Sequence, residues 1–219
     1  MSAINADGMV THPRVRPMRF MQIERGPLKK IEGIIVHQTD TVDEKGVFGN
    51  YRHPNAHGAH FLIGKDGTIW QTASLLQRTS HVGNLKPRCL FEMKCSPAEL
   101  KPLQQALKKP DGPASHRLEM MKSVPARYPS NLDSVGIEIV GKATLPANRP
   151  VPAGLNGRLR DLFIGENAVY EPVTGAQQAS LQWLIDFLRQ SFHVPATEVH
   201  RHPDVSWKNR TEASTAQWK

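Results

Sequence analysis

The chain has 219 residues, of which 39% are hydrophobic and 6% aromatic, and it carries a formal net charge of +8. This length is enough for one domain with its own core, while seventeen prolines and sixteen glycines argue against a compact helical bundle. The positive charge favours polyanionic partners such as nucleic acid, anionic lipid headgroups or acidic wall polymers. Because the sequence has no nucleic-acid-binding motif and no block of Lys and Arg, we do not expect nucleic acid as the partner.

No apolar run approaches the length that spans a bilayer, so stable membrane insertion is not expected. The first residues lack the basic and apolar regions of a standard secretion signal, which predicts synthesis in the cytoplasm without a signal peptide. Cys89 and Cys95 fit a disulfide in an oxidising compartment and two free thiols in a reducing one equally well.

The first third of the chain predicts mostly strands. Residues 1–30 show no clear period and predict an extended arm or an edge strand that leads into a domain over 31–219. Residues 33–37 form a short branched apolar run, which predicts a buried strand, and the polar residues 38–58 predict a loop with room for a short helical turn. The dipeptide Asp66-Gly67, between apolar runs at 61–64 and 68–71, predicts a β-hairpin.

The middle of the chain is rich in Pro, Lys and Met, and residues 85–130 are interpreted as an insertion. Within it, Ser96 and Pro97 predict the start of a helix that covers about 97–108. Residues 134–141 predict a second strand, in which Glu138 projects from the face opposite to the apolar side chains of Val135, Ile137 and Ile139.

The last third predicts a loop over 142–170 and then one long helix. Thr174 and Gln177 form a capping-box pattern, Pro195 ends the helix, and a regular apolar stripe lies between them: Leu181, Leu184, Ile185, Leu188 and Phe192. Strands mixed with helices in this order predict an α/β (α+β) fold, a single domain with a central mixed β-sheet flanked by helices.

Three side chains can supply ligands to one metal ion. His37 ends the first predicted strand, and His202 and Glu212 lie ten residues apart near the C-terminus. Two imidazoles and a carboxylate can bind Zn²⁺ and leave a fourth position open, which distinguishes catalytic from structural zinc sites and suits hydrolysis of an amide. The alternative is that one or both histidines are surface residues in a polar loop.

Five segments occur in an order that resembles the zinc N-acetylmuramoyl-L-alanine amidases of the amidase-2 family, which is related in fold to peptidoglycan recognition proteins. They are IIVHQT (34–39), AHFLIGKDGTI (59–69), SHVG (80–83), SVGIEI (134–139) and the segment 202–212. The resemblance covers about residues 31–218, with an unusual insertion near 85–130. It implies an enzyme that cleaves the amide bond between N-acetylmuramic acid and L-Ala of peptidoglycan.

Carried over residue by residue, the resemblance implies that Zn²⁺ is bound by His37, His202 and Glu212, where the family usually has Asp at the last position. His200 is the local competitor for His202, and the spacing to the acid favours His202. Glu138 matches the strand glutamate that is thought to act on the zinc-bound water in muropeptide-recycling amidases of the AmpD type. The alternative for Glu138 is an exposed carboxylate on an open sheet face.

Other positions bear on the type of amidase and on the substrate. Ala59 replaces a Tyr that phage-lysozyme-type and animal recognition-protein amidases often carry, which favours the AmpD-like branch. Arg210 stands where the family usually has Lys and would stabilise the oxyanion, although a solvated surface arginine is the alternative. His81 and Asn84 are assigned to substrate binding, and His81 could instead hydrogen-bond to the residues behind the metal.

These patterns predict a zinc hydrolase of peptidoglycan that is lytic or secretion-delivered and antibacterial, like an endolysin or a type VI secretion effector. It would act on the wall in the periplasm, with an immunity protein or a component of the secretion apparatus as a further partner. The alternatives are a cytosolic muropeptide-recycling amidase and a non-catalytic recognition module. A zinc protease is weaker, because the His-Glu-x-x-His motif is absent from the sequence.

Overall fold

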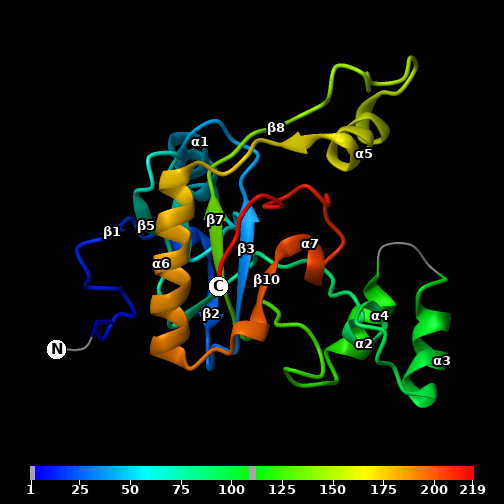
Figure 1. Cartoon of the computed structure of the whole chain (residues 1–219), viewed down its shortest axis with the longest axis horizontal. Helices are drawn as coiled ribbons and strands as arrows, with labels where there is room; N and C mark the ends of the chain where they lie inside the picture. Colours follow the sequence, from blue (N-terminus) through cyan, green and yellow to red (C-terminus); the bar gives the residue numbers. More distant parts are fainter. Residues whose placement is uncertain (1–2, 109–111) are drawn as a thin grey trace.

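A six-stranded mixed sheet forms the centre of the computed structural model, which describes residues 3–108 and 112–219 (Figure 1). The strand order is β1-β5-β4-β7-β3-β10, and every neighbouring pair is parallel except the hairpin of β4 and β5. The strands are β1 (Val15–Pro17), β3 (Gly33–Gln38), β4 (Phe61–Ile63), β5 (Ile69–Gln71), β7 (Ser134–Ile139) and β10 (Val199–Arg201). The predicted mixed-sheet fold, the hairpin and an edge strand within residues 1–30 are confirmed.

The register between β3 and β7 decides which side chains share a face. Val36 pairs with Ile137, and both side chains pack in the core on one side of the sheet. The next pair, His37 and Glu138, therefore points to the opposite face, because successive side chains alternate along a strand. The predicted orientation of Glu138 is confirmed by this arrangement.

Helix α6 (Gly175–Phe192) covers the core face of the sheet, as Figure 1 shows. It begins at the predicted capping box, where Thr174 Oγ1 accepts from Gln177 N at 3.1 Å and Gln177 Oε1 accepts from Thr174 N at 3.0 Å. Its buried stripe packs against the strands, and each leucine or isoleucine contributes about 2 kcal/mol by leaving water: Leu181, Leu184, Ile185 and Leu188. The helix ends at Phe192, where His193 adopts a left-handed conformation with φ of 56°.

The opposite face is covered near its edge by α1 (Glu44–Tyr51), whose first turn is capped by the Asp43 carboxylate at 3.0 Å from Gly46 N. The expected loop over 38–58 therefore contains two helical turns. Val47 and Tyr51 are the buried residues of α1, and they pack with the turn η1 (Met21–Ile23) and with the sheet. A smaller antiparallel pair, β2 (Glu24–Pro27) and β6 (Gln77–Thr79), lies beside this cluster.

The described part of the insertion contains three short helices, α2 (Arg88–Phe91), α3 (Pro97–Ala106) and α4 (Pro113–Glu119), which lie together at one end of the molecule (Figure 1). Helix α3 starts as predicted, with a capping box from Ser96 to Glu99. A disulfide joins Cys89 to Cys95. The buried Arg88 guanidinium binds the buried Glu198 carboxylate at 2.8 Å, which ties the insertion to η2 (Ala196–Glu198) and to the strand after it.

The expectation of a loop over 142–170 is wrong. Strands β8 (Ala143–Thr144) and β9 (Val169–Tyr170) pair, and α5 (Gly157–Asn167) lies between them in the chain. No side chain of α5 is buried, although Leu159, Leu162 and Phe163 have the spacing of one helix face, a signal that the prediction of a loop missed. Tertiary contacts hold it instead, since Asn209 Nδ2 donates to Gly165 O at 2.8 Å and to Ala168 O at 2.7 Å. Among the described residues, no helix is both long and apolar enough to cross a membrane.

Candidate metal centre

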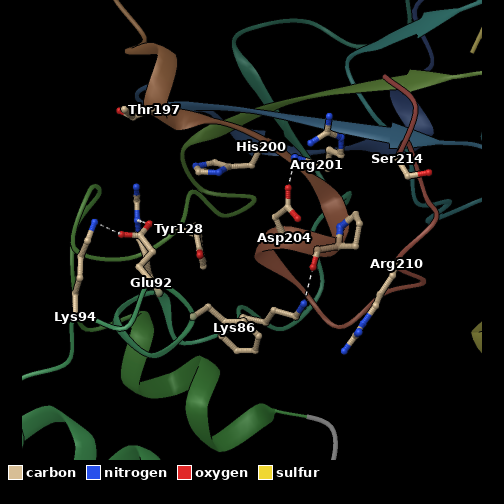
Figure 2. Close-up of a pocket in the computed structure, with 13 residues that line it drawn as sticks. Lys86, Glu92, Lys94, Tyr128, Thr197, His200, Arg201, Asp204, Arg210 and Ser214 are labelled. Carbon is tan, nitrogen blue, oxygen red and sulfur yellow. Dashed lines mark hydrogen bonds and ion pairs between the residues drawn. The ribbon is translucent and has the colours of Figure 1, made fainter. Parts of the chain in front are cut away.

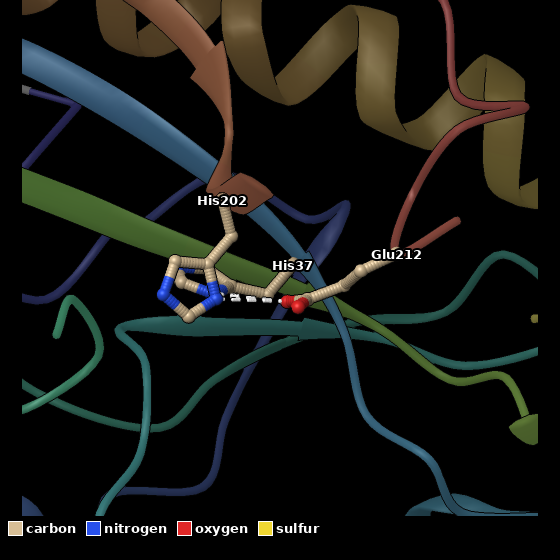
Figure 3. A group of neighbouring side chains, drawn as sticks. All are labelled: His37, His202 and Glu212. Atoms are coloured by element: carbon tan, nitrogen blue, oxygen red, sulfur yellow. Dashed lines mark hydrogen bonds and ion pairs between the residues drawn. The ribbon is translucent and has the colours of Figure 1, made fainter. Parts of the chain in front are cut away.

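The side chains of His37, His202 and Glu212 converge on the face of the sheet opposite to α6 (Figure 3). All three are buried, and one potential ligand atom of each lies within 4.8 Å of the others. Glu212 Oε1 lies 2.9 Å from His202 Nδ1 and 3.5 Å from His37 Nδ1. The sequence placed these residues far apart, and the structure brings the predicted set together.

The sheet and one side-chain bridge explain this convergence. Strand β10 pairs with β3 so that Arg201 is opposite Val36, and His202, the first residue of α7 (His202–Val205), therefore comes beside His37. Glu212 belongs to the turn that follows, and this turn is fixed where Gln38 Oε1 accepts from Ala213 N at 3.1 Å. The three side chains therefore come from the ends of the adjacent strands β3 and β10 and from a loop that is hydrogen-bonded to Gln38 at the end of β3.

A chain of hydrogen bonds behind His37 fixes its tautomer. Ser134 Oγ must donate to Ser130 O at 2.6 Å, so at 3.3 Å from His81 Nε2 it accepts. His81 Nδ1 then carries no proton and accepts from His37 Nε2 at 3.0 Å. His37 Nδ1 is consequently the unprotonated nitrogen, and it faces Glu212. His81 was expected either to bind substrate or to hydrogen-bond to the residues behind the metal. Its buried position and its hydrogen bond to His37 fit the second of these predicted roles.

The ionisation of the cluster suits a cation. Burial and the nearby His202 lower the pKa of His37 to about 4, so its imidazole is neutral at neutral pH. Although burial opposes ionisation of Glu212, its hydrogen bond with His202 lowers its pKa. A lone pair of His37 Nδ1 therefore faces a carboxylate, and buried His202 Nε2 has no hydrogen-bond partner in the described part of the chain. Two imidazoles and an ionised carboxylate are a donor set that fits Zn²⁺.

Glu138 lies beside His37 on the neighbouring strand and is half-buried. Burial, and next the negative charge of Glu212, raise the pKa of Glu138 to about 7. The Tyr51 hydroxyl accepts from Ala59 N at 3.2 Å and hydrogen-bonds to the Glu138 carboxyl. Burial, and next the charge of Glu138, raise the pKa of Tyr51 well above its usual value, so this hydroxyl remains protonated. Helix α1 therefore places the hydroxyl of Tyr51 next to residue 59, where this sequence has alanine in place of a tyrosine.

Two cations precede Glu212, and they lie in different surroundings. The exposed Arg210 lines a cavity together with Lys86 and Asp204, and its charge acts on Lys86. Lys208 is also exposed, and its charge opposes protonation of both His37 and Glu138. Arg210 was the predicted oxyanion residue, whereas sequence reasoning passed over Lys208. Of these two cations, Lys208 is the one whose charge acts on His37 and Glu138.

The remaining predicted residues lie near the site or behind it. Asn84 is half-buried beside a cavity of about 540 Å³ under the insertion, and its carbonyl accepts from Ser206 Oγ at 2.9 Å. His200 lies outside the cluster, where its ring contacts Tyr128 and its Nε2 is 3.4 Å from Glu198. Sequence reasoning missed the roles of Ser134 and Tyr51 at the site. For Tyr51, the local signal was the small Ala59 before a strand histidine.

The sequence profile of the family described as N-acetylmuramoyl-L-alanine amidase (Amidase_2) matches residues 27–214. No similarity to a curated protein sequence was found. Among solved structures, an endolysin N-acetylmuramoyl-L-alanine amidase from Clostridium intestinale is similar with a TM-score of 0.47 at 17% identity, covering 91% of this chain and 89% of the endolysin. A selenomethionine AmpD derivative gives 0.49 at 15% identity, covering 95% and 90%. Drosophila PGRP-LB gives 0.44 at 12% identity, covering 92% and 91%. With the profile matching most of its length, this chain belongs to the N-acetylmuramoyl-L-alanine amidase family.

Proposed function

We propose that this protein is a zinc-dependent amidase that hydrolyses the bond between the lactyl group of N-acetylmuramic acid and L-Ala of peptidoglycan. The observation that carries this proposal is the buried cluster of His37, His202 and Glu212 with Glu138 beside it. Bound to these three residues, Zn²⁺ would polarise the amide carbonyl and activate water. All three positions hold residues that can bind a metal, which favours an enzyme over a recognition module.

The chain's own residues account for the proton transfers. Glu138 takes a proton from the attacking water as the new bond from oxygen to the lactyl carbon forms, and a pKa of about 7 suits a base at neutral pH. It returns that proton to the nitrogen of L-Ala as the carbon–nitrogen bond breaks. The hydrogen bond to His81 keeps the Nδ1 lone pair of His37 turned toward the cluster. A cation, Arg210 by family resemblance or Lys208 by its field, balances the charge of the oxyanion.

The biological setting that we propose is antibacterial: a lytic or secretion-delivered enzyme that acts on the wall in the periplasm, with an immunity protein as a further partner. The disulfide between Cys89 and Cys95 supports this setting, since structural disulfides are typical of oxidising compartments. The basic surface, with a net charge of +8, would concentrate the enzyme on an anionic wall polymer. The rival setting is cytosolic recycling of soluble muropeptides.

Digestion of purified sacculi, with products identified by mass spectrometry, tests both proposals. We expect intact stem peptides that begin at L-Ala, no release in the presence of a zinc chelator, and recovery when Zn²⁺ is added back. Intact sacculi left uncut by zinc-loaded protein that still binds them would instead identify a recognition module. Cleavage restricted to soluble anhydro-muropeptides would assign the protein to recycling.

A further inference from the structure

Two large aromatic side chains are exposed together on the face between the insertion and the segment that carries the metal ligands. Phe91, at the end of α2, is 46% exposed, and Trp207 is 45% exposed. Their ring centroids lie 5.6 Å apart with an angle of 74° between the planes. Trp207 is five residues from His202 and five from Glu212, so it lies on the segment that carries two of the predicted metal ligands. Single exposed apolar residues are common, whereas two adjacent exposed aromatic rings form a candidate surface for a ligand.

This aromatic pair is held in place rather than left free to rotate. Lys86 Nζ lies 4.9 Å from the ring centroid of Phe91 and 5.3 Å from that of Trp207, and it donates to Pro203 O at 2.5 Å. Any side chain at Gly112 would collide with the Trp207 indole, so the insertion packs tightly against this ring. Phe91 also lies between the two cysteines of the disulfide. Side chains that are ordered before binding lose less entropy when a ligand arrives.

Phe91 lines a cavity of about 880 Å³, which is in the size range of small-ligand sites (Figure 2), and Trp207 packs edge-on against Phe91. Lys86, Asp204 and Arg210 also line this cavity, and Asp204 and Arg210 are exposed polar residues. Several further cations of the lining already have partners. Arg88 binds Glu198 and Glu92, Lys94 binds Glu92, and Arg201 donates to the carbonyls of Ala213 and Ala216.

We propose that Phe91 and Trp207 form a platform for an N-acetylated amino sugar of the glycan strand. This inference rests on the proposed function, because the amide to be cleaved is attached to such a sugar through its lactyl group. An aromatic ring packs well on the C–H face of a pyranose, and Asp204, Arg210 and Lys86 can hydrogen-bond to its hydroxyl and acetamide groups. The engaged cations favour this uncharged ligand over an anionic peptide.

The binding test uses chitotetraose, a glycan that has neither lactyl group nor peptide, with isothermal titration calorimetry on zinc-loaded protein. The double variant Phe91→Ala/Trp207→Ala should bind at least about tenfold more weakly than the wild type. Met93→Ala is the matched control, since Met93 is 93% exposed on the same loop, and it should bind as the wild type does. Trp207→Phe, which keeps an aromatic face, should restore most of the affinity that Trp207→Ala loses.

The cleavage test compares sacculi with muramyl dipeptide, which contains only one sugar. The double variant should lose more activity on sacculi than on muramyl dipeptide, chiefly through a higher KM. If chitotetraose binds through the two rings while no substrate is cut, the amidase proposal fails and the platform stands. If the wild type does not bind chitotetraose, or the double variant equals the wild type in binding and in sacculus cleavage, the platform is overturned and the amidase proposal is untouched.

Discussion

The metal centre and the insertion place their side chains by opposite means. His37 and Glu138 are neighbours because β3 and β7 pair in register, and the cluster they belong to lies against the sheet. Phe91 sits on a four-residue helix that a disulfide and the Arg88–Glu198 ion pair hold in place. Backbone register fixes positions closely, whereas side-chain bridges can be removed one at a time. Changes at the centre should therefore abolish chemistry, and changes in the insertion should alter stability and substrate preference.

The largest effect is expected for His37→Ala at the metal centre. Loss of a ligand removes several kcal/mol of transition-state stabilisation, which lowers kcat/KM by roughly a thousandfold. Zinc content should fall in parallel, measured by mass spectrometry of the dialysed protein. His53→Ala is the control, because His53 is exposed and outside the cluster, and it should keep both zinc and activity. Full turnover in His37→Ala would contradict the metal assignment.

Glu138→Gln should come next, with kcat lowered by about a hundredfold, the lower end of the usual contribution of a general base. Because Glu138 must be ionised to accept a proton and its pKa is raised to about 7, wild-type activity should rise as the pH passes about 7. The variant's residual activity should lack this acid limb, measured as kcat against pH at constant zinc. An unchanged limb would assign the titration to another group.

Arg210→Ala and Lys208→Ala together test which cation serves the centre. If Arg210 stabilises the oxyanion, its loss should lower kcat by about a hundredfold, in line with removal of one such donor. Lys208 lowers the pKa of Glu138, so Lys208→Ala should move the acid limb of the kcat profile to higher pH. Because Lys208 is exposed, salt should weaken its effect. A wild-type profile in Lys208→Ala would exclude it from the centre.

Arg88→Met addresses the insertion and should change stability more than chemistry. It leaves the buried Glu198 without its main partner, which costs about 3 kcal/mol in the free energy of unfolding, measured by urea denaturation. The double variant Arg88→Met/Glu198→Met should recover part of this loss. Although burial opposes ionisation of Glu198, hydrogen bonds with His200 and Arg88 lower its pKa. The stabilisation that ionised Glu198 gives the wild type should therefore be fully present above pH 4.5, the ordinary pKa of a glutamate. It should disappear as the pH falls through the lowered pKa of Glu198 in the folded protein.

Zinc affinity should distinguish the two regions in the same variants. Arg88→Met should bind zinc as the wild type does while it remains folded, because the ligand set rests on the sheet and not on the insertion. If Arg88→Met loses zinc at denaturant concentrations well below its unfolding transition, the insertion supports the centre directly, and the contrast between the two regions fails.

The sequence by itself determined the strand at 33–37, the hairpin around Asp66-Gly67, the capped helices at Ser96 and Thr174, and the candidate ligands His37, His202 and Glu212. Each of these leaves a local signal in periodicity, turn chemistry or motif spacing. The zinc-binding role of these three residues stays a prediction. The oxyanion role of Arg210 and the substrate-binding roles of His81 and Asn84 also stay predictions.

Only the tertiary structure decided the rest. Helix α5 has no fully buried side chain and is held by a hydrogen bond from Asn209, a residue far from it in the chain. Tyr51 reaches Glu138 from another element, and the direction of the hydrogen bonds through His81 depends on where Ser134 donates. These features arise from contacts between segments far apart in the chain. Local propensity contains no information about such contacts, because their energy exists only once the sheet has set its register.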